Sequence, residues 1–111
     1  MSIVGVVGSR TFKDYLLLSK ELDKISITKI VSGGAMGADS LAIQYAIYKG
    51  LPYIIYPANW DLHGKKAGFI RNIEIVSNSD EIIAFWDGVS KGTKSTIDIA
   101  NKQGKKVTII S

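Results

Sequence analysis

Continuous apolar runs alternate with helical patterns along the whole chain. The run at residues 3–7 has no polar side chain, which is typical of a strand buried on both faces of a sheet. Similar short runs predict further strands at residues 30–31, 53–56, 82–86 and 107–110. Together these runs predict a sheet of about five strands.

Apolar residues between these runs recur at helical spacing, as Leu18, Leu22 and Ile25 do. The expected helices run over residues 15–25, from residue 38 to a stop at Gly50, over roughly residues 66–78, and from the 87–93 loop to Gly104. A loop is expected through Trp60 and His63.

The order of these elements predicts the fold class. Strand and helix alternate four times, which calls for a parallel sheet with right-handed crossovers. We therefore expect an α/β fold, a Rossmann-like doubly wound parallel β-sheet with about five strands and four helices. Residues 1–111 are expected to form a single domain.

Composition excludes several classes of site. The chain has no cysteine and one histidine, His63, which argues against a disulfide framework, a zinc site and a Ser–His–Asp or Cys–His catalytic set. No apolar run approaches the roughly 20 residues needed to cross a bilayer. The N-terminus enters a strand directly, without an export-type segment. We therefore expect a cytoplasmic protein with no membrane partner, no metal and no cofactor.

The charge distribution points to a small anionic ligand. The net charge of +4 is too small for a dedicated nucleic-acid tail. Of the fourteen basic residues, only Arg10 and Arg71 are arginines, whose planar fork suits phosphate or carboxylate. Both fall within the blocks described next, which indicates recognition.

The loop after the second strand carries the strongest signal. Gly33, Gly34 and Gly37, with Ala35 between them, let the backbone approach a ligand, and the following helix start supplies unpaired N–H groups. Asp39 falls in the first helical turn, where it would accept a hydrogen bond from a ribose hydroxyl. The spacing is neither a Walker loop nor the dinucleotide fingerprint. The alternative is a tight turn with Asp39 as a helix cap.

The loop after the first strand supplies Gly8, Ser9 and Arg10. Ligands gather at the carboxyl edge of a doubly wound sheet, so Arg10 is expected to clamp a phosphate and Ser9 to donate a hydroxyl hydrogen bond. The alternative is a surface arginine beside a polar turn.

The loop after the fourth strand repeats this arrangement before the last helix. Its candidate ligand contacts are Asp87, Gly88, Ser90, Gly92 and Thr93. The helix start would hold phosphate, and Asp87 would meet a sugar hydroxyl or a base amine. A capped helix beside a flexible lysine is the alternative.

The third helix places Gly68, Arg71 and Asn72 on one face, at positions i, i+3 and i+4. The glycine would leave room for something flat beside the guanidinium. The alternative is an exposed Arg71 paired with Glu74.

Side chains outside these loops are weaker candidates. Trp60 lies beyond a strand end, where its indole could stack on a base, and Lys66 could face phosphate. The alternatives are core packing for Trp60 and a solvated side chain for Lys66. We take Trp86 as a core residue and His63 as a loop residue.

These blocks resemble the SLOG superfamily, which includes the DNA-processing protein DprA/Smf and the LOG-type (Lonely Guy) nucleotide hydrolases. The residues that carry the resemblance are the 32–39 loop, Arg71-Asn72 and Gly92-Thr93, in that order. Within the superfamily the chain looks most like the small YspA/YpsA-related group, through residues 8–10, 57–60, 63–68 and 84–88. The resemblance spans residues 3–110.

The resemblance implies a Rossmann-like sheet that binds nucleotides or nucleotide-derived ligands along its carboxyl edge. LOG-type hydrolases cleave the N-glycosidic bond of a nucleoside monophosphate, with an arginine matched here by Arg71, the candidate catalytic residue. They also use a glutamate three residues after Gly-Thr, and this chain has Thr96 there. Threonine cannot stabilise an oxocarbenium-like sugar or activate water as a carboxylate does.

Three functions are therefore consistent with the sequence. The first is binding of a nucleoside phosphate or an ADP-ribose-like molecule, as a sensor or processing protein. The second is LOG-type hydrolysis, which would need Asp39, Asp87 or Asp98 in place of the missing glutamate. The third is DprA-like binding of single-stranded DNA, for which the scattered lysines give less support. Because LOG- and DprA-like relatives associate, a homodimer or higher homo-oligomer is expected.

Overall fold

Five parallel strands form one sheet, in the order β3-β2-β1-β4-β5. The strands are β1 (Ser2–Gly8), β2 (Ile27–Ser32), β3 (Tyr53–Ile55), β4 (Glu81–Phe85) and β5 (Lys106–Ile110). This computed structural model describes residues 1–111. It confirms the expected parallel α/β fold.

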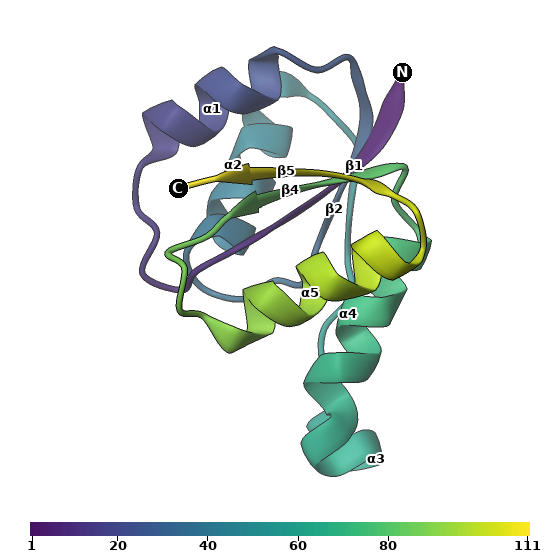
Figure 1. Cartoon of the computed structure of the whole chain (residues 1–111). Coiled ribbons are helices and arrows are strands. Elements are labelled where there is room, and N and C mark those ends of the chain that lie inside the picture. The colour runs from purple at the N-terminus through teal and green to yellow at the C-terminus, as the bar shows by residue number, and fades with distance from the viewer.

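Helices cover both faces of the sheet, so the sheet is doubly wound. Figure 1 shows α1 (Tyr15–Asp23) and α2 (Ala38–Lys49) on one side, and α4 (Ala67–Ser77) and α5 (Lys91–Lys102) on the other. Buried residues follow the same division. Leu18 and Ala42 of the first pair and Ile75 and Ile97 of the second belong to separate apolar clusters.

Neighbouring residues of the central strands contribute to opposite clusters, as the unbroken apolar runs predict. In β1, Val6 packs into the α1–α2 cluster and Val7 into the α4–α5 cluster. In β4, Phe85 and Ala84 divide in the same way. The two central strands are therefore held from both sides, and their carboxyl ends form a firm base for the loops that follow.

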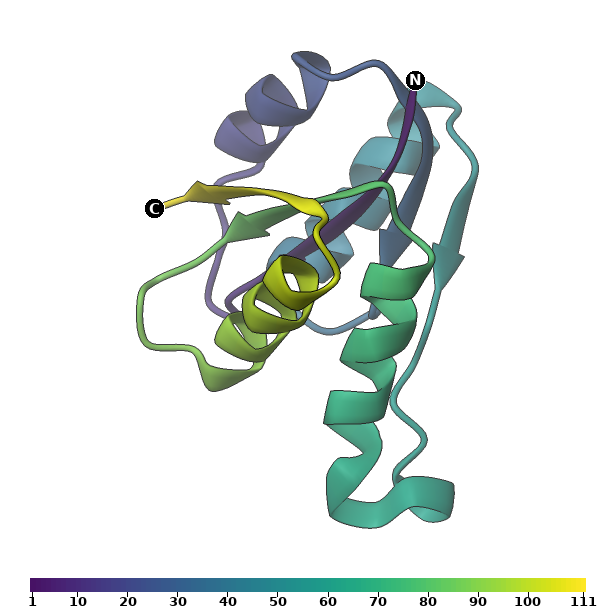
Figure 2. The same cartoon turned by 45° about the vertical axis from the view of Figure 1, so that its right-hand side comes forward.

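The expected loop through Trp60 and His63 is wrong in part, because a short helix forms there. Asn59 caps α3 (Trp60–His63), its side-chain oxygen accepting from the Leu62 N–H at 3.1 Å. A 3₁₀ turn, η1 (Gly64–Lys66), leads into α4. In Figure 2, α3 and the first turns of α4 extend beyond the sheet.

The strand order reverses between β1 and β4. From β1 the chain moves outward through β2 to β3, then crosses to the other side of β1 to form β4 and β5. In open α/β sheets, ligands bind in the crevice at such a switch point, outside the carboxyl ends of the strands.

No helix of this structure is both long enough and apolar enough to span a bilayer.

Candidate functional site

A cavity of about 410 Å³ opens at the switch point between the ends of β1 and β4. Its walls come from the loops after both strands, the 35–39 segment, α4 and the first turns of α5. Its lining residues are Val7, Gly8, Ser9, Arg10, Thr11, Ala35, Asp39, Arg71, Asn72, Ile75, Asp87, Ser90, Gly92, Thr93 and Thr96. The volume is within the range of small-molecule sites.

Most of the residues expected at a ligand site line this one cavity. The predicted residues that do so are Gly8, Ser9, Arg10, Ala35, Asp39, Arg71, Asn72, Asp87, Ser90, Gly92 and Thr93. Those outside its lining are Gly33, Gly34, Gly37, Trp60, Lys66, Gly68 and Gly88. Both arginines and the loops after β1, β2 and β4 therefore meet at one place.

Ser9 joins the two strands that flank the cavity. Its N–H donates to the Phe85 carbonyl at 3.0 Å, and its Oγ accepts from the Asp87 N–H at 3.1 Å. Its carbonyl also accepts from the N–H groups of Phe12 and Ala38. Ser9 is 3% exposed, so these bonds form largely out of water. Its role in the structure is to fix the loop after β1 against β4 and α2.

Arg71 reaches across the sheet edge to the loop after β2. Its Nη1 donates to the Gly33 carbonyl at 3.1 Å and its Nε to Asn72 Oδ1 at 3.1 Å. Asn72 Nδ2 in turn donates to the Gly92 carbonyl at 3.4 Å. The Arg71 ion pair with Glu74, considered as an alternative, is not among the salt bridges. The guanidinium keeps further N–H donors for a ligand.

Gly33 makes room for this arrangement although it does not line the cavity. A Cβ at this position would lie 2.5 Å from Arg71 Nη1 and 2.9 Å from Asp39 Oδ2. Gly37 has a φ of +80°, and a Cβ there would overlap the backbone of Ser9 and Arg10. These two glycines permit close packing behind the site, so their role in the structure is steric.

Asp39 is buried beside the cavity, with 6% of its surface exposed. Its Oδ2 accepts from the Ala35 N–H at 3.3 Å, so the side chain folds back onto its own loop and does not cap α2. Burial raises the pKa of this carboxyl to about 6, against the opposing effects of the Ala35 hydrogen bond and the Arg71 and Arg10 charges. It is therefore a carboxyl whose pKa lies above its ordinary value, at about 6.

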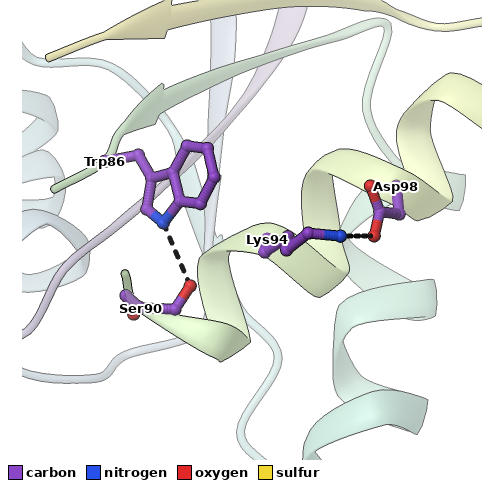
Figure 3. A network of polar contacts seen from close by, with 4 residues as sticks. All are labelled: Trp86, Ser90, Lys94 and Asp98. Atoms are coloured by element: carbon purple, nitrogen blue, oxygen red, sulfur yellow. Dashed lines mark hydrogen bonds and ion pairs between the residues drawn. The ribbon is translucent and has the colours of Figure 1, made fainter. Parts of the chain in front are cut away.

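Asp87 stabilises the loop that precedes α5. Its Oδ1 accepts from the N–H groups of Val89 at 2.9 Å and Ser90 at 2.8 Å. These two backbone hydrogen bonds lower the pKa of its carboxyl. The Trp86 indole Nε1 donates to the Ser90 carbonyl at 3.0 Å, which Figure 3 shows from close by. Trp86 is therefore a residue that fixes the loop.

The first turns of α5 form one wall of the cavity. Gly92 has an ordinary φ, and a Cβ there would meet nothing within 4 Å. The fold itself therefore does not need a glycine at this position. Thr96 also lines the cavity, but its Oγ1 donates to the Gly92 carbonyl at 3.2 Å and the residue is buried.

The expected room beside Arg71 at Gly68 is not found. A Cβ at Gly68 would lie 3.5 Å from the Trp60 ring, so the glycine faces that indole rather than the cavity. Trp60 is 57% exposed on α3, and Lys66 is exposed on η1. Neither side chain lines the cavity, because α3 and η1 form between β3 and α4, which no residue pattern had indicated.

Four lining residues were not among the expected ligand contacts. Thr11 directly follows the Arg10 loop, and Thr96 lies one turn after Gly92, so their sequence neighbours gave a signal. Val7 and Ile75 are core side chains at the cavity floor. Nothing in the apolar pattern separates such residues from the rest of the core.

Comparison with known proteins gives the family. The YspA, cpYpsA-related SLOG family matches residues 2–63, which include β1, β2 and the loops that supply Arg10 and Asp39. The chain belongs to this SLOG family. This SLOG protein is also 37% identical over 116 residues to the Gene 61 protein of Mycobacterium phage D29, covering 94% of the chain and 92% of that protein. The expected resemblance is confirmed.

Two solved structures share the fold of this SLOG protein. DNA processing protein A (DprA) from Streptococcus pneumoniae matches with a TM-score of 0.78 and 22% identity, over 98% of this chain and 50% of that one. DprA from Helicobacter pylori, described by its single-stranded DNA binding mode, matches with a TM-score of 0.67 and 23% identity, over 96% and 64%. The chain thus spans about half to two thirds of these proteins, and the similarity shows a shared fold.

Proposed function

We propose that this SLOG protein binds a nucleotide or nucleotide-derived ligand, such as a nucleoside phosphate or an ADP-ribose-like molecule, in the switch-point cavity. The observation that carries the proposal is the convergence of Arg10, Arg71 and the first turns of α5 on one cavity. Two guanidinium groups and a helix start favour a phosphate-bearing molecule.

The cavity also carries groups suited to the uncharged part of such a ligand. Asp39 and Asp87 both line it, and a carboxylate accepts hydrogen bonds from ribose hydroxyls or a base amine. Inorganic phosphate would leave these acceptors unused. The mixture of cationic and acidic groups therefore favours a sugar phosphate or nucleotide over a simple anion.

Gly92 gives the proposal independent support. Because the fold leaves open space where its Cβ would be, a ligand that approaches the α5 backbone closely would explain why a glycine occupies this position. Gly92 lies where such a ligand would meet the first turn of α5.

Hydrolysis of an N-glycosidic bond is the second candidate. It would place Arg71 near the scissile sugar, and the carboxyls at the cavity are Asp39 and Asp87. The backbone N–H groups of Val89 and Ser90 lower the pKa of Asp87, while burial raises the pKa of Asp39 to about 6. Asp39 is therefore the group that a hydrolytic mechanism would use for proton transfer. Asp98 lies on α5 outside the cavity lining.

A thermal-shift screen of nucleoside phosphates and sugar nucleotides tests binding. A ligand at about 100 times its Kd stabilises the folded state by about 2.7 kcal/mol. Chromatography of the incubated mixture then separates the two candidates. Unchanged ligand supports binding alone, and free base with ribose phosphate supports hydrolysis.

Arg10→Ala is the sharpest variant for this screen. Arg10 is exposed and takes part in no side-chain hydrogen bond or salt bridge, so the fold does not depend on it. Loss of a hydrogen-bonded charge is expected to weaken binding by about 1.5–3 kcal/mol. Lys13→Ala is the matched control, because Lys13 is an exposed cation of the same loop that does not line the cavity. Equal effects of the two variants would contradict the proposed site.

A further inference from the structure

A second groove, of about 700 Å³, runs along the outer face of α5 against the first turn of α4. It shares no lining residue with the switch-point cavity. Its walls include Phe69 of α4 and Lys91, Lys94, Asp98 and Lys102 of α5. The proposed nucleotide site gives this groove no role.

The groove is cationic because of the helical spacing of its lysines. Lys91, Lys94 and Lys102 fall on one face of α5, opposite the side that packs Thr96, Ile97 and Ala100 into the protein. Lys94 forms an ion pair with Asp98 at 2.9 Å, which Figure 3 shows lying along α5. Lys91 and Lys102 take part in none of the ion pairs of the chain, and the Lys94–Asp98 pair is exposed, where such a pair contributes little, so all three lysines can contact a partner.

Phe69 adds an aromatic surface to this cationic groove. Its side chain is 56% exposed, although Val76, two turns further along the same face of α4, is fully packed. An exposed ring in the same groove as three ammonium groups matches the two components with which proteins hold single strands, a basic track for the backbone and aromatic rings for the bases.

We propose that the α4–α5 groove binds a single-stranded nucleic acid, with its phosphates along the three lysines and a base stacked on Phe69. Lys91 and Lys102 lie about 16 Å apart along the helix axis. At the rise of about 3.4 Å per nucleotide of a stacked strand, the track holds on the order of five nucleotides. The charge complementarity favours a polyanion, and the ring favours one that carries flat bases over an acidic polypeptide.

The test measures binding of a fluorescent single-stranded oligonucleotide of mixed sequence by anisotropy across a series of salt concentrations. Three phosphate contacts predict a slope of about −2 for log K against log salt concentration. The double variant Lys94→Gln and Lys102→Gln removes two of them, so the slope is expected to shrink by about 1.4.

The matched control is Lys20→Gln with Lys24→Gln on the α1 side, which covers the opposite face of the sheet. Each pair consists of one ion-paired lysine and one lysine without an ion pair, since Lys24 lies 2.7 Å from Glu21. The two double variants therefore have the same net charge. Equal slopes for both would overturn the proposal, because they would show a response to overall charge alone.

Phe69 provides the second measurement. Phe69→Ala is expected to weaken oligonucleotide binding on the order of tenfold, while Phe69→Tyr retains it. Poly-glutamate serves as competitor. If it displaces the oligonucleotide at equal charge concentration, or if Phe69→Ala binds as wild type does, the groove is a general polyanion surface and the nucleic-acid proposal fails.

The groove and the cavity are tested separately by the same set of proteins. The groove variants are expected to leave the thermal shift with a mononucleotide unchanged, and Arg10→Ala to leave the salt slope of the oligonucleotide unchanged. No shift with any mononucleotide would count against the proposed function alone, and no lysine-dependent oligonucleotide binding would count against the groove alone.

Discussion

At the residue scale, Gly33 and Gly92 are both glycines near the site, but the structure gives them different tasks. Gly33 faces Arg71 and Asp39 so closely that any side chain would displace them. Gly92 faces open space and has an ordinary backbone conformation. One glycine is needed by the protein itself, and the other is free to serve a ligand.

Alanine substitution is expected to separate these two tasks. Gly33→Ala should lower stability by about 1–3 kcal/mol and weaken ligand binding, because the new Cβ forces Arg71 out of place. Gly92→Ala should raise stability by about 0.5–1 kcal/mol, since alanine is the better helix former, and still weaken binding. Urea denaturation and ligand titration measure both effects. Unchanged affinity in Gly92→Ala would show that no ligand approaches this turn closely.

Asp39 gives the protein a pH-dependent stability. Because burial raises the pKa of Asp39 to about 6, the folded state keeps a proton between about pH 4 and 6 that the unfolded state releases. The stability that this proton provides is full below about pH 4 and is lost as the pH rises through 6, a change of about 3 kcal/mol.

Asp39→Asn is expected to remove this dependence. Urea unfolding of the wild type and the variant at pH 4, 5, 6 and 7 measures it. The free energy of unfolding of the wild type, relative to the variant, should fall across the window. A constant difference would contradict the raised pKa.

At the element scale, the loop between β2 and α2 is locked against the loop after β1. Gly37, the residue before α2, has a φ of +80° and contacts the backbone of Ser9 and Arg10. Gly50, after the same helix, has a φ of +70°, but a Cβ there would have no neighbour within 4 Å. The two glycines therefore share a positive φ but differ in ψ and in packing.

Gly37→Ala is expected to lower stability more than Gly50→Ala. Gly50 is in the left-handed helical region, where a non-glycine residue costs about 1 kcal/mol, whereas Gly37, with a ψ of −129°, is in a region that essentially only glycine occupies, so its backbone cost is larger. Only Gly37→Ala also pushes Arg10 away from the cavity, so only it should weaken ligand binding. Thermal denaturation and ligand titration check both points. Similar losses in the two variants would show that the contact with Ser9 is unimportant.

Most of the helices and strands could be predicted from the sequence. The loops that line the cavity could be predicted too, but not how their residues pack. Apolar runs with helical patterns between them indicated the strands and the four main helices, because burial on two faces leaves a continuous pattern in β1 and β4. Helix α3 was missed, since a single turn capped by Asn59 has no periodicity. The glycine loops indicated the site, but their spacing could not show that Gly33 packs against Arg71 or that Gly68 faces Trp60.

At the scale of the whole molecule, exposed apolar residues are concentrated in one part of the chain, which includes β3. Eight of the thirteen large apolar side chains that are exposed fall within residues 47–69, and three are the whole of β3. Strand β3 is also an edge of the sheet, with backbone groups on its outer side that no strand pairs. Natural proteins usually protect such an edge.

The expected homo-oligomer can be tested at this edge. Ile54→Lys places a charge in the middle of β3 and is expected to shift sedimentation equilibrium towards the monomer. Lys is tolerated there because Ile54 is partly exposed. Val89→Lys is the control, since Val89 is an exposed apolar residue on a loop far along the chain from β3. Equal masses for the wild type and both variants would place any association elsewhere.

The contacts of Ser9 determine how the cavity can respond to an occupant. One residue bonds to β4, to the Asp87 turn, to the α2 start and to its own loop. With these segments already fastened, an incoming molecule meets a framework that needs little rearrangement, and little of its interaction energy is used in ordering the loops. Complex formation should therefore be a single fast kinetic phase, and Ser9→Ala should introduce a slower one.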